Sequence, residues 1–430
     1  MNKVIILGLG KTGLSCVHYF LRNGVTPTVV DTRNNPPGQE ALPEQVPLVC
    51  GPLDATLLCQ AEMIIASPGM ALATPALQTA LQAGVEVIGD IELFVRAAKA
   101  PIVAITGSNG KSTVTTLVGD MAAEAGLSVG VGGNIGTPAL DLLLQPAELY
   151  VLELSSFQLE TTFSLKAAAA VILNLSEDHL DRYEGMAGYL AAKQRIHQGA
   201  EHIISNRDDA ATVPVSQRVW RSFGLDEQQY GRVMHHDRLW LAVNGEPLLA
   251  VSEMKIVGAH NQMNALAAMA LCDAVGIARN AQLAVLRRFQ GLPHRCQFVR
   301  ERNGVRWIND SKATNVGSTL AAVSGVAESV QGKLVVIAGG QGKGQDFSPL
   351  QSLLGNGIDH LLCFGQDAEV LLALGPQAER VEDLDAAVTR AAALTQAGDW
   401  VLLAPACASL DMFRNFEQRG DRFRALVEAL

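Results

Sequence analysis

The sequence predicts an α/β protein of three domains: an N-terminal Rossmann-like domain, a central P-loop ATPase-like domain with a parallel sheet, and a C-terminal Rossmann-like domain. Three observations support this fold class. Short apolar segments alternate with helical patterns, which is the order of parallel βαβ units. Two of these segments lead into glycine-rich loops that begin a helix. With 430 residues, 48% of them apolar, the chain is long enough for about three separate cores.

The first and last domains should meet the central one near Gly89 and Gly291. We therefore expect domains over residues 1–88, 89–291 and 292–430. No internal sequence repeat is visible, so the three domains are expected to be distinct units and not copies of one another.

Composition and charge exclude several classes of protein. The net charge is −10 and the basic residues are scattered, which argues against a nucleic-acid partner or an anionic membrane surface. No apolar run reaches the ~20 residues of a membrane-spanning helix. The start of the chain resembles a lipoprotein signal only faintly, because Lys11 and three glycines interrupt its apolar core. The seven cysteines contain no Cys-x-x-Cys pair and favour a reducing cytoplasm.

The first glycine-rich loop is Gly8-Leu9-Gly10-Lys11-Thr12-Gly13, which follows the expected strand Val4–Leu7. A second strand, Thr28–Val30, ends in Asp31, about twenty residues after the loop. This pattern suits a pyrophosphate at the loop and a ribose or base edge at the acid. An NAD-dependent dehydrogenase and a UDP-carrying substrate meet these demands equally, and glycines that only pack helix against strand are a third interpretation.

The second loop is Thr106-Gly107-Ser108-Asn109-Gly110-Lys111-Ser112-Thr113, between the apolar segment 101–105 and a helix that lasts to about Ala125. Backbone N–H groups and the helix start favour a polyphosphate, Lys111 adds a point charge, and Ser112 offers a hydroxyl to Mg²⁺. The strict pattern has a further glycine where this chain has Ile105. The loop predicts an ATP site, and the alternative is a glycine-rich turn with a solvated lysine.

Polar residues near the next expected strands extend this site. Gly130–Gly136 is too rich in glycine for a strand interior, so we expect a loop there. Glu153 ends the apolar strand Leu149–Leu154, where it could either bind Mg²⁺ or face water. His179 lies in a charged run after the strand Ala170–Leu173, at an edge where open α/β sheets bind ligands.

The rest of the central segment gives weaker signals. Lys193 lies on the expected helix Gly185–Gly199, where propensity alone predicts a surface lysine. Residues 203–253 form short β-rich pieces. Asn264 lies near the start of the helix Asn261–Val275, either as part of its cap or as a group that reads a base.

The last segment repeats the alternation of strands and polar loops. Four strands are expected, over Val305–Ile308, Leu334–Ala338, His360–Phe364 and Trp400–Leu403. Three polar runs follow them, at 309–315, 339–344 and 406–409. These runs belong at the carboxyl edge of a further parallel sheet, where ligands bind.

Taken together, these blocks resemble the Mur ligases of bacterial cell-wall synthesis over nearly the whole chain. The motifs that carry the resemblance are Thr-Gly-Ser-Asn-Gly-Lys-Ser-Thr (106–113), Gly-Gly-Asn-Ile-Gly (132–136), Glu-Leu-Ser-Ser-Phe-Gln-Leu-Glu (153–160), Leu-Pro-His-Arg (292–295), Asn-Asp-Ser-Lys-Ala-Thr-Asn (309–315) and Asn-Phe-Glu-Gln-Arg-Gly (415–420). Several unrelated blocks in the family's order make a chance match very improbable. The pattern is most similar to the branch of the family that adds D-glutamate.

The resemblance implies an ATP-dependent ligase of peptidoglycan precursor synthesis. Such an enzyme joins the alanine carboxylate of UDP-N-acetylmuramoyl-L-alanine to the amine of D-glutamate through an acyl phosphate. It also implies Mg²⁺, a carbamylated lysine at position 193, a cytoplasmic monomer, and no nucleic-acid or membrane partner. Carbamylation requires a neutral amine and reverses the surface prediction for Lys193.

The resemblance also implies roles for individual residues. The catalytic residues would be Lys111, His179 and Lys193. The metal ligands would be Ser112, Glu153, His179 and Lys193. The ATP contacts would be Gly107, Asn109, Gly110, Lys111, Ser112, Thr113, Asn264, Arg295 and Asp310. The UDP-substrate contacts would be Lys11, Thr12, Asp31, Thr32, Arg33, Ser67 and Asn134. The D-glutamate contacts would be Lys312, Thr314, Lys343, Ser409 and Phe416.

One departure from the family and two alternatives stay open. Family members often carry an acid at the position of Gln341, so the surroundings of Lys343 are in doubt. A dehydrogenase would leave the ATP loop without a role. A nucleotide-binding protein without chemistry would bind ATP but show no turnover.

Overall fold

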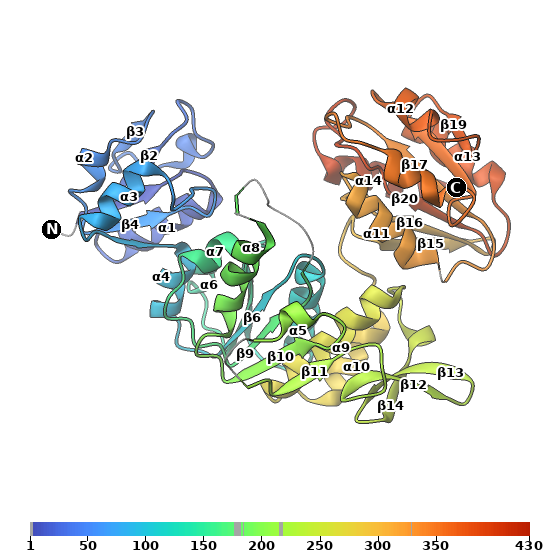
Figure 1. The fold of residues 1–430 in the computed structure, drawn as a ribbon, viewed down its shortest axis with the longest axis horizontal. Coiled ribbons are helices and arrows are strands. Elements are labelled where there is room, and N and C mark those ends of the chain that lie inside the picture. Colours follow the sequence, from blue (N-terminus) through green and yellow to red (C-terminus); the bar gives the residue numbers. More distant parts are fainter. Residues whose placement is uncertain (1–2, 176–181, 184, 215–217, 328) are drawn as a thin grey trace. The chain divides into compact units, whose positions relative to one another are not determined.

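The computed structural model describes residues 3–175, 182–183, 185–214, 218–327 and 329–430 (Figure 1). The chain forms two compact units, Met1–Leu249 with Met263–Val285, and Ala250–Gln262 with Leu286–Leu430. The first unit contains two sheets and the second contains one. The α/β fold class is confirmed, whereas the boundaries near residues 88 and 291 stay predictions.

The first sheet has five parallel strands in the order β3-β2-β1-β4-β5. Its strands are β1 (Val4–Leu7), β2 (Thr28–Asp31), β3 (Leu48–Cys50), β4 (Met63–Ala66) and β5 (Glu86–Ile88). Its helices are α1 (Lys11–Arg22), α2 (Ala55–Leu58), α3 (Pro75–Gln82) and α4 (Asp90–Ala97). In register, Leu7 pairs with both Val30 and Ala66. The residues after β1, β2 and β4 therefore meet at one edge, at the point where the strand order reverses.

Apolar side chains cover both faces of this sheet. On one face, Ile5 and Leu7 pack with Leu58 of α2 and Leu77 of α3. On the other face, Phe20 of α1 belongs to a cluster that continues through α4 into the core of the central sheet. The first two sheets therefore share a continuous apolar core within the first unit.

The central sheet has nine strands in the order β14-β13-β12-β11-β10-β9-β6-β8-β7. Its strands are β6 (Ile102–Thr106), β7 (Val129–Gly133), β8 (Leu149–Glu153), β9 (Ala169–Ile172), β10 (His202–Asn206), β11 (Arg221–Phe223), β12 (Tyr230–His235), β13 (Arg238–Val243) and β14 (Glu246–Ala250). The helices of this part of the chain are α5 (Lys111–Glu124), α6 (Ala139–Leu142), α7 (Ser156–Glu160), α8 (Gly185–Gln194), α9 (Ala259–Ala274) and α10 (Arg279–Arg288). Along the sheet from β7 to β12, with β6 among them, neighbouring strands pair in parallel. Strand β13 pairs antiparallel with β12.

The prediction of a loop over Gly130–Gly136 was wrong for its first four residues, which belong to β7 (Val129–Gly133), and confirmed for residues 134–136, which lie outside any helix or strand. Gly132 pairs with Leu152 of β8, so the backbone is a regular strand. A Cβ atom on Gly130 would lie 2.7 Å from Cδ1 of Tyr150, and one on Gly132 would lie 2.2 Å from the carbonyl oxygen of Thr137. Gly130 and Gly132 are therefore needed for close packing and not for a turn.

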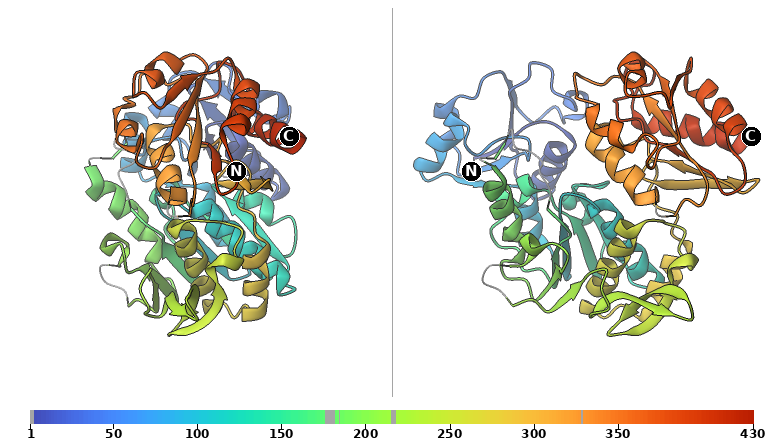
Figure 2. Two further views of the ribbon diagram at one scale, coloured as in Figure 1. Left: turned by 90° about the vertical axis from the view of Figure 1, so that its right-hand side faces the viewer. Right: turned by 45° about the vertical axis from the view of Figure 1, so that its right-hand side comes forward.

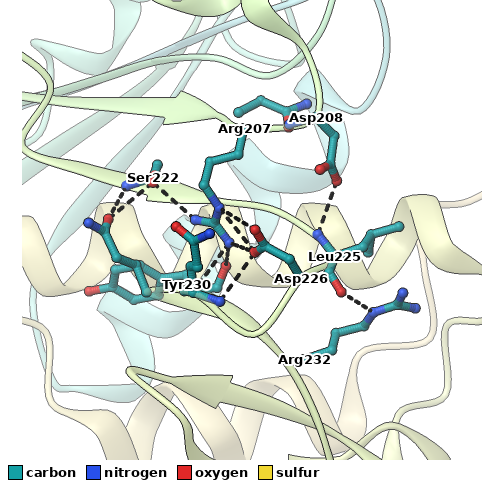
Figure 3. A network of polar contacts seen from close by, with 10 residues as sticks. Arg207, Asp208, Ser222, Leu225, Asp226, Tyr230 and Arg232 are labelled. Atoms are coloured by element: carbon teal, nitrogen blue, oxygen red, sulfur yellow. Dashed lines mark hydrogen bonds and ion pairs between the residues drawn. The ribbon is translucent and has the colours of Figure 1, made fainter.

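The far end of the central sheet confirms the short β-rich pieces expected there, and Figure 2 shows its yellow-green strands from two further sides. Arg207 fastens the connection between β11 and β12 (Figure 3). Its guanidinium pairs with Asp226 and donates to the carbonyl oxygens of Gln228 (2.7 Å) and Tyr230 (3.2 Å). It also donates to Ser222 Oγ at 3.0 Å. One half-buried cation thus holds the turn between two parallel strands.

The second unit contains a six-stranded sheet in the order β15-β16-β20-β17-β18-β19, parallel except for β15. Its strands are β15 (Gln297–Arg302), β16 (Val305–Asn309), β17 (Leu334–Gly339), β18 (His360–Phe364), β19 (Ala378–Arg380) and β20 (Trp400–Leu403). Its helices are α11 (Val316–Ala327), α12 (Ala368–Leu372), α13 (Leu384–Leu394) and α14 (Phe416–Ala429). Because β20 lies between β16 and β17, the three predicted polar runs gather at one edge of this sheet.

Candidate active site

The phosphate loop continues the central strand β6 between β8 and β9. In register, Ile105 pairs with Glu153 and Thr106 pairs with Ile172. Gly107 has φ +153°, and a Cβ atom there would lie 3.0 Å from Cβ of Leu173. The loop therefore lies directly against the end of β9 at a position that only glycine fits.

Asn174 holds the phosphate loop in place and was not among the predicted site residues. Its carbonyl oxygen accepts from Ser108 N at 2.9 Å, and its Oδ1 accepts from Asn109 N at 2.8 Å. Its Nδ2 donates to the carbonyl oxygen of Asn109 at 3.1 Å. The available signal was its place as the first polar residue after an apolar strand.

Lys111 lies at the mouth of the loop and is the first residue of α5. Its Nζ donates to the carbonyl oxygens of Gly107 and Ser108, both at 2.9 Å. Ser112 is buried in the same first turn of the helix, followed by Thr113, which is half-buried. The ammonium group and the positive end of the helix dipole therefore face the same loop, which is an arrangement suited to a polyphosphate.

Lys193 is buried, with 2% of its surface exposed, so the surface prediction from propensity was wrong. Its Nζ donates to the carbonyl oxygen of Gly107 at 3.0 Å and to Thr106 Oγ1 at 3.2 Å. The same ammonium lies 4.7 Å from the ring centroid of Tyr189, whose hydroxyl is 3.2 Å from Ser108 Oγ. Packing of α8 against the phosphate loop decides this placement, and helix propensity contains no such information.

Glu153 is the carboxylate of this site, with 3% of its surface exposed. Asn134 Nδ2 donates to Glu153 Oε1 at 2.8 Å, and Asn134 N donates to the carbonyl oxygen of Glu153 at 2.8 Å. Within the described residues, Oε2 of Glu153 has no hydrogen-bond partner. A buried carboxylate oxygen without a donor suits a hard cation such as Mg²⁺.

The other expected metal ligands are not all placed. His179 lies outside the described residues. Among the residues that are described, no group of three or more His, Cys, Asp or Glu side chains could hold a metal ion. From the described residues alone, a metal site here would combine Glu153 with ligands of other kinds, such as Ser112 and a modified Lys193.

Asn264 of α9 is also part of this cluster. It is buried, and a Cβ atom on Gly110 would lie only 2.4 Å from its Oδ1. The amide therefore lies against the phosphate loop, so five expected site residues from separate segments gather around it. They are Lys111, Asn134, Glu153, Lys193 and Asn264.

Asp31 braces the first glycine-rich loop. Its Oδ2 accepts from Leu9 N at 2.7 Å, and its Oδ1 accepts from Arg33 Nε at 2.8 Å and Arg33 N at 2.9 Å. Hydrogen bonding from the Arg33 side chain, aided by the Leu9 amide, holds the pKa of Asp31 well below its usual range. Asp31 thus fixes both Leu9 in the loop and the Arg33 side chain.

The remaining first-domain candidates surround the same loop. Ser67 Oγ donates to the carbonyl oxygen of Gly8 at 3.4 Å. Lys11 Nζ donates to the carbonyl oxygen of Gly136 at 3.4 Å, in the segment that follows β7. Thr12 is half-buried and Thr32 is exposed. These side chains form one edge of the first sheet, as expected from the strand order.

Asp310 lies in the second unit, at the end of β16. Its Oδ1 accepts from Cys296 N at 3.2 Å. Burial raises the pKa of Asp310 to about 6, and the nearby cations Arg295 and Lys312 oppose this shift. Arg295 lies between two residues with left-handed backbone, His294 (φ +61°) and Cys296 (φ +41°). The two expected ATP contacts of the second unit are therefore neighbours.

The expected D-glutamate contacts lie at the same edge of this sheet. Lys312 Nζ is 4.5 Å from the ring centroid of Phe416. The loops of Lys343 and Ser409 are joined by reciprocal backbone hydrogen bonds of 2.9 Å between Gln341 and Ala408. Thr314 N donates to the carbonyl oxygen of Lys312 at 2.8 Å. The structure places these residues on neighbouring loops of the second unit.

Arg419, within the 415–420 motif, ties these loops together. Its guanidinium is fully buried and donates to the carbonyl oxygens of Ser311 (2.9 Å), Gly339 (3.3 Å) and Cys407 (3.1 Å). Each acceptor belongs to a different one of the three polar loops. Sequence reasoning used Arg419 only as part of a motif, because two of its three carbonyl partners, Gly339 and Ser311, lie 80 and 108 residues away in the chain.

Models of three families match successive parts of the chain. They are described as the Mur ligase MurD-like N-terminal domain (residues 2–89), the Mur ligase middle domain (residues 105–272) and the Mur ligase glutamate ligase domain (residues 294–407). The chain belongs to the Mur ligase family.

Similar proteins cover the whole length of this Mur ligase. It is 58% identical over 433 residues to the UDP-N-acetylmuramoylalanine–D-glutamate ligase of Pectobacterium atrosepticum, covering 100% of this chain and 98% of the relative. It is 56% identical, with the same coverage, to the enzyme of that name from Escherichia coli K12. The structure of UDP-N-acetylmuramate-alanine ligase MurC from Thermotoga maritima matches with a TM-score of 0.60, 19% identity and full coverage of both chains. That last likeness concerns the fold alone.

The comparisons confirm the resemblance, the fold class and an ATP-dependent ligase activity. The roles of individual residues stay predictions. In the described part of the chain, none of the helices is both long and apolar enough to cross a bilayer. The seven cysteines all lie in that part and are free thiols.

Proposed function

We propose that this Mur ligase joins D-glutamate to the alanine carboxylate of UDP-N-acetylmuramoyl-L-alanine and converts ATP to ADP and phosphate. The observation that carries the proposal is the 58% identity over the full chain to a ligase named for that reaction. The gathering of Lys111, Glu153 and Lys193 around one phosphate loop supports it. A dehydrogenase would leave this loop without a role.

ATP is required because a carboxylate is a poor electrophile. An oxygen of the alanine carboxylate first attacks the γ-phosphorus, which gives an acyl phosphate and releases ADP. The amine of D-glutamate then attacks the acyl carbon, loses a proton, and the tetrahedral intermediate expels phosphate. Both reacting groups of the first step are anionic, so fixed cations must offset their repulsion.

We assign the phosphoryl-transfer site to the phosphate loop and its neighbours. Lys111 neutralises the β- and γ-phosphates, and the loop residues Gly107, Asn109, Gly110, Ser112 and Thr113 contact the polyphosphate. Asn264 reaches the same loop and contributes to ATP binding. We also assign Arg295 and Asp310 to ATP binding.

We assign Mg²⁺ to Ser112, Glu153, His179 and a carbamylated Lys193. The unsatisfied Oε2 of Glu153 fits such an ion. When bound, Mg²⁺ would neutralise negative charge on the phosphoryl oxygens. The Lys193 amine faces the loop oxygens of Thr106 and Gly107, so its carbamate would add an anionic ligand at the same place.

We assign the two other substrates to the first and last sheets. UDP-N-acetylmuramoyl-L-alanine uses the edge of the first sheet, termed the UDP cradle below, and Asn134 contacts the substrate beyond it. The cradle consists of Lys11, Thr12, Asp31, Thr32, Arg33 and Ser67. D-glutamate, a dicarboxylate, suits the two lysines, the two hydroxyls and the ring supplied by Lys312, Lys343, Thr314, Ser409 and Phe416. We further propose a cytoplasmic monomer.

The test is release of inorganic phosphate with each substrate omitted in turn. We expect release only when ATP, UDP-N-acetylmuramoyl-L-alanine and D-glutamate are present together with Mg²⁺. Release with L-lysine or meso-diaminopimelate in place of D-glutamate would assign the chain to another amino-acid substrate. Mass spectrometry of the peptide that contains Lys193 tests the carbamate separately.

A further inference from the structure

Arg182 connects the two sheets of the first unit near the candidate active site. Its Nη2 donates to the carbonyl oxygen of Met70 at 3.1 Å and to Glu160 Oε2 at 3.2 Å. Its Cζ lies 4.5 Å from the ring centroid of Phe157. The side chains of Arg182 and Glu160 are only 15% and 19% exposed, so this pair is more shielded from water than a surface ion pair.

Met70 ends the turn that follows β4. Its N–H donates to the carbonyl oxygen of Ser67 at 2.9 Å, which closes the turn. Ser67 in turn lies against the first glycine-rich loop, because a Cβ atom on Gly8 would be 2.7 Å from Ser67 Oγ. Arg182 is therefore hydrogen-bonded to the turn that carries Ser67 of the UDP cradle.

Phe157 and Glu160 belong to α7, which is separated from the end of β8 by two residues. The helix is short, and a capping box formed by Ser155 and Gln158 stabilises its N-terminus. Ser155 Oγ accepts from Gln158 N at 3.2 Å, and Gln158 Oε1 accepts from Ser155 N at 3.1 Å. The partners of Arg182 on α7 are thus held at a fixed position relative to Glu153.

We propose that Arg182 is a positioning residue for the ligase reaction, which sets the turn Ser67–Met70 relative to the strand end that carries Glu153. The inference rests on the UDP cradle proposed above. The substrate must extend from that cradle to the phosphate loop, so the spacing of the two sites decides where its alanine carboxylate lies. Arginine suits this role because its planar fork can meet a carbonyl, a carboxylate and a ring face together, whereas an ammonium cannot.

The test compares Arg182→Gln and Arg182→Lys by steady-state kinetics of the full chain. For Arg182→Gln we expect the KM for UDP-N-acetylmuramoyl-L-alanine to rise about tenfold, while the KM values for ATP and D-glutamate change less than twofold. Arg182→Lys keeps the charge but should restore less than half of the lost kcat/KM. The same rise in all three KM values, or a loss of activity that follows the folded fraction alone, would overturn the proposal.

Arg306 offers a matched control in the second unit. Its Nε lies 2.9 Å from Glu301 Oε2 and its Cζ lies 5.2 Å from the ring centroid of Trp400, the same kinds of contact that Arg182 makes. Arg306→Gln should leave all three KM values unchanged. Glu160→Gln should add nothing to Arg182→Gln, because the two residues act as one unit; full additivity would contradict the coupling. Failure of the wild type to use the UDP substrate would instead overturn the proposed function.

Discussion

The two glycine-rich loops of the first unit share a plan but differ in how their charged groups are used. Each follows a parallel strand and leads into a helix whose first residue is a lysine, Lys11 or Lys111. Beside the first loop, Asp31 accepts hydrogen bonds from the chain's own donors at both oxygens. Beside the second loop, Glu153 has an oxygen without a donor in the described part of the chain. The carboxylate beside the first loop is fully used within the protein, whereas the carboxylate beside the second loop keeps an oxygen that a ligand could use.

The largest effect should come from exchanging the two lysines for uncharged residues. Lys111→Met removes the ammonium at the loop mouth, so phosphate release should fall by about 10³-fold. Lys11→Met removes a more exposed cation at the UDP cradle and should raise the KM for the UDP substrate by at most about tenfold, with kcat unchanged. Phosphate-release kinetics of both variants measure the difference. Equal losses of kcat would show that the two loops do not differ in the way proposed.

A smaller effect is expected from Asp31→Asn, which tests the brace of the first loop. Loss of the charged hydrogen bonds to Leu9 and Arg33 should lower the free energy of unfolding by about 2 kcal/mol at pH 7. The folded-state pKa of Asp31 is lowered, so its stabilisation is present above the ordinary carboxyl pKa of about 4 and is lost as pH falls below it. The difference in free energy of unfolding between wild type and variant should therefore become smaller at low pH.

Urea denaturation at pH 7, 5 and 3.5 measures this dependence. Asp54→Asn is the control, because Asp54 in the same domain is an exposed helix cap that accepts from Thr56 N at 2.8 Å. If Asp31→Asn lowered the free energy of unfolding by the same amount at every pH, the proposed stabilisation by the charged Asp31 would be contradicted.

The smallest effect, of opposite sign, is expected at Asp90, the first residue of α4 between the two loops. Asp90 is buried, Gln158 Nε2 donates to its Oδ2 at 3.4 Å, and within the described residues its Oδ1 has no partner. Burial raises its pKa to about 6. The folded state thus favours the protonated acid, and this contribution to stability is lost as pH rises from about 4 through 6.

Asp90→Asn should consequently be more stable than the wild type by about 1 kcal/mol at pH 7.5, and no more stable below pH 4. Urea denaturation at these two pH values provides the measurement. A variant that is less stable at pH 7.5 would show that the carboxylate of Asp90 is charged and satisfied, as at Asp31.

The sequence predicted well those features that depend on local pattern. The strands before both glycine-rich loops, the helix after Lys111, and the acid at the end of β8 all follow from residues close together in the chain. The topology also placed the expected side chains at the carboxyl edges of parallel strands, where the structure has them.

The missing features depend on contacts between distant segments. Gly130 and Gly132 of β7 are needed because Tyr150 and Thr137 lie close to them. Lys193 is buried because it packs against the phosphate loop. The roles of Asn174 and Arg419 depend on hydrogen bonds with backbone groups 65 and 80 residues away, and a local pattern does not show such contacts. The resemblance to a family indicated the place of Lys193, but it gave no reason for Asn174.

The position of Lys111 on its own loop has a consequence for the cost of binding a nucleotide. Since the ammonium already rests on the carbonyl oxygens of Gly107 and Ser108, much of its water has been removed during folding. Asn174 likewise has already restricted the loop backbone, so little conformational entropy is left to lose. When a phosphate binds, the fixed ammonium group therefore replaces its contacts with neutral carbonyl groups by a contact with a full negative charge. Selectivity for polyanions over neutral ligands is in this way built in before the ligand arrives.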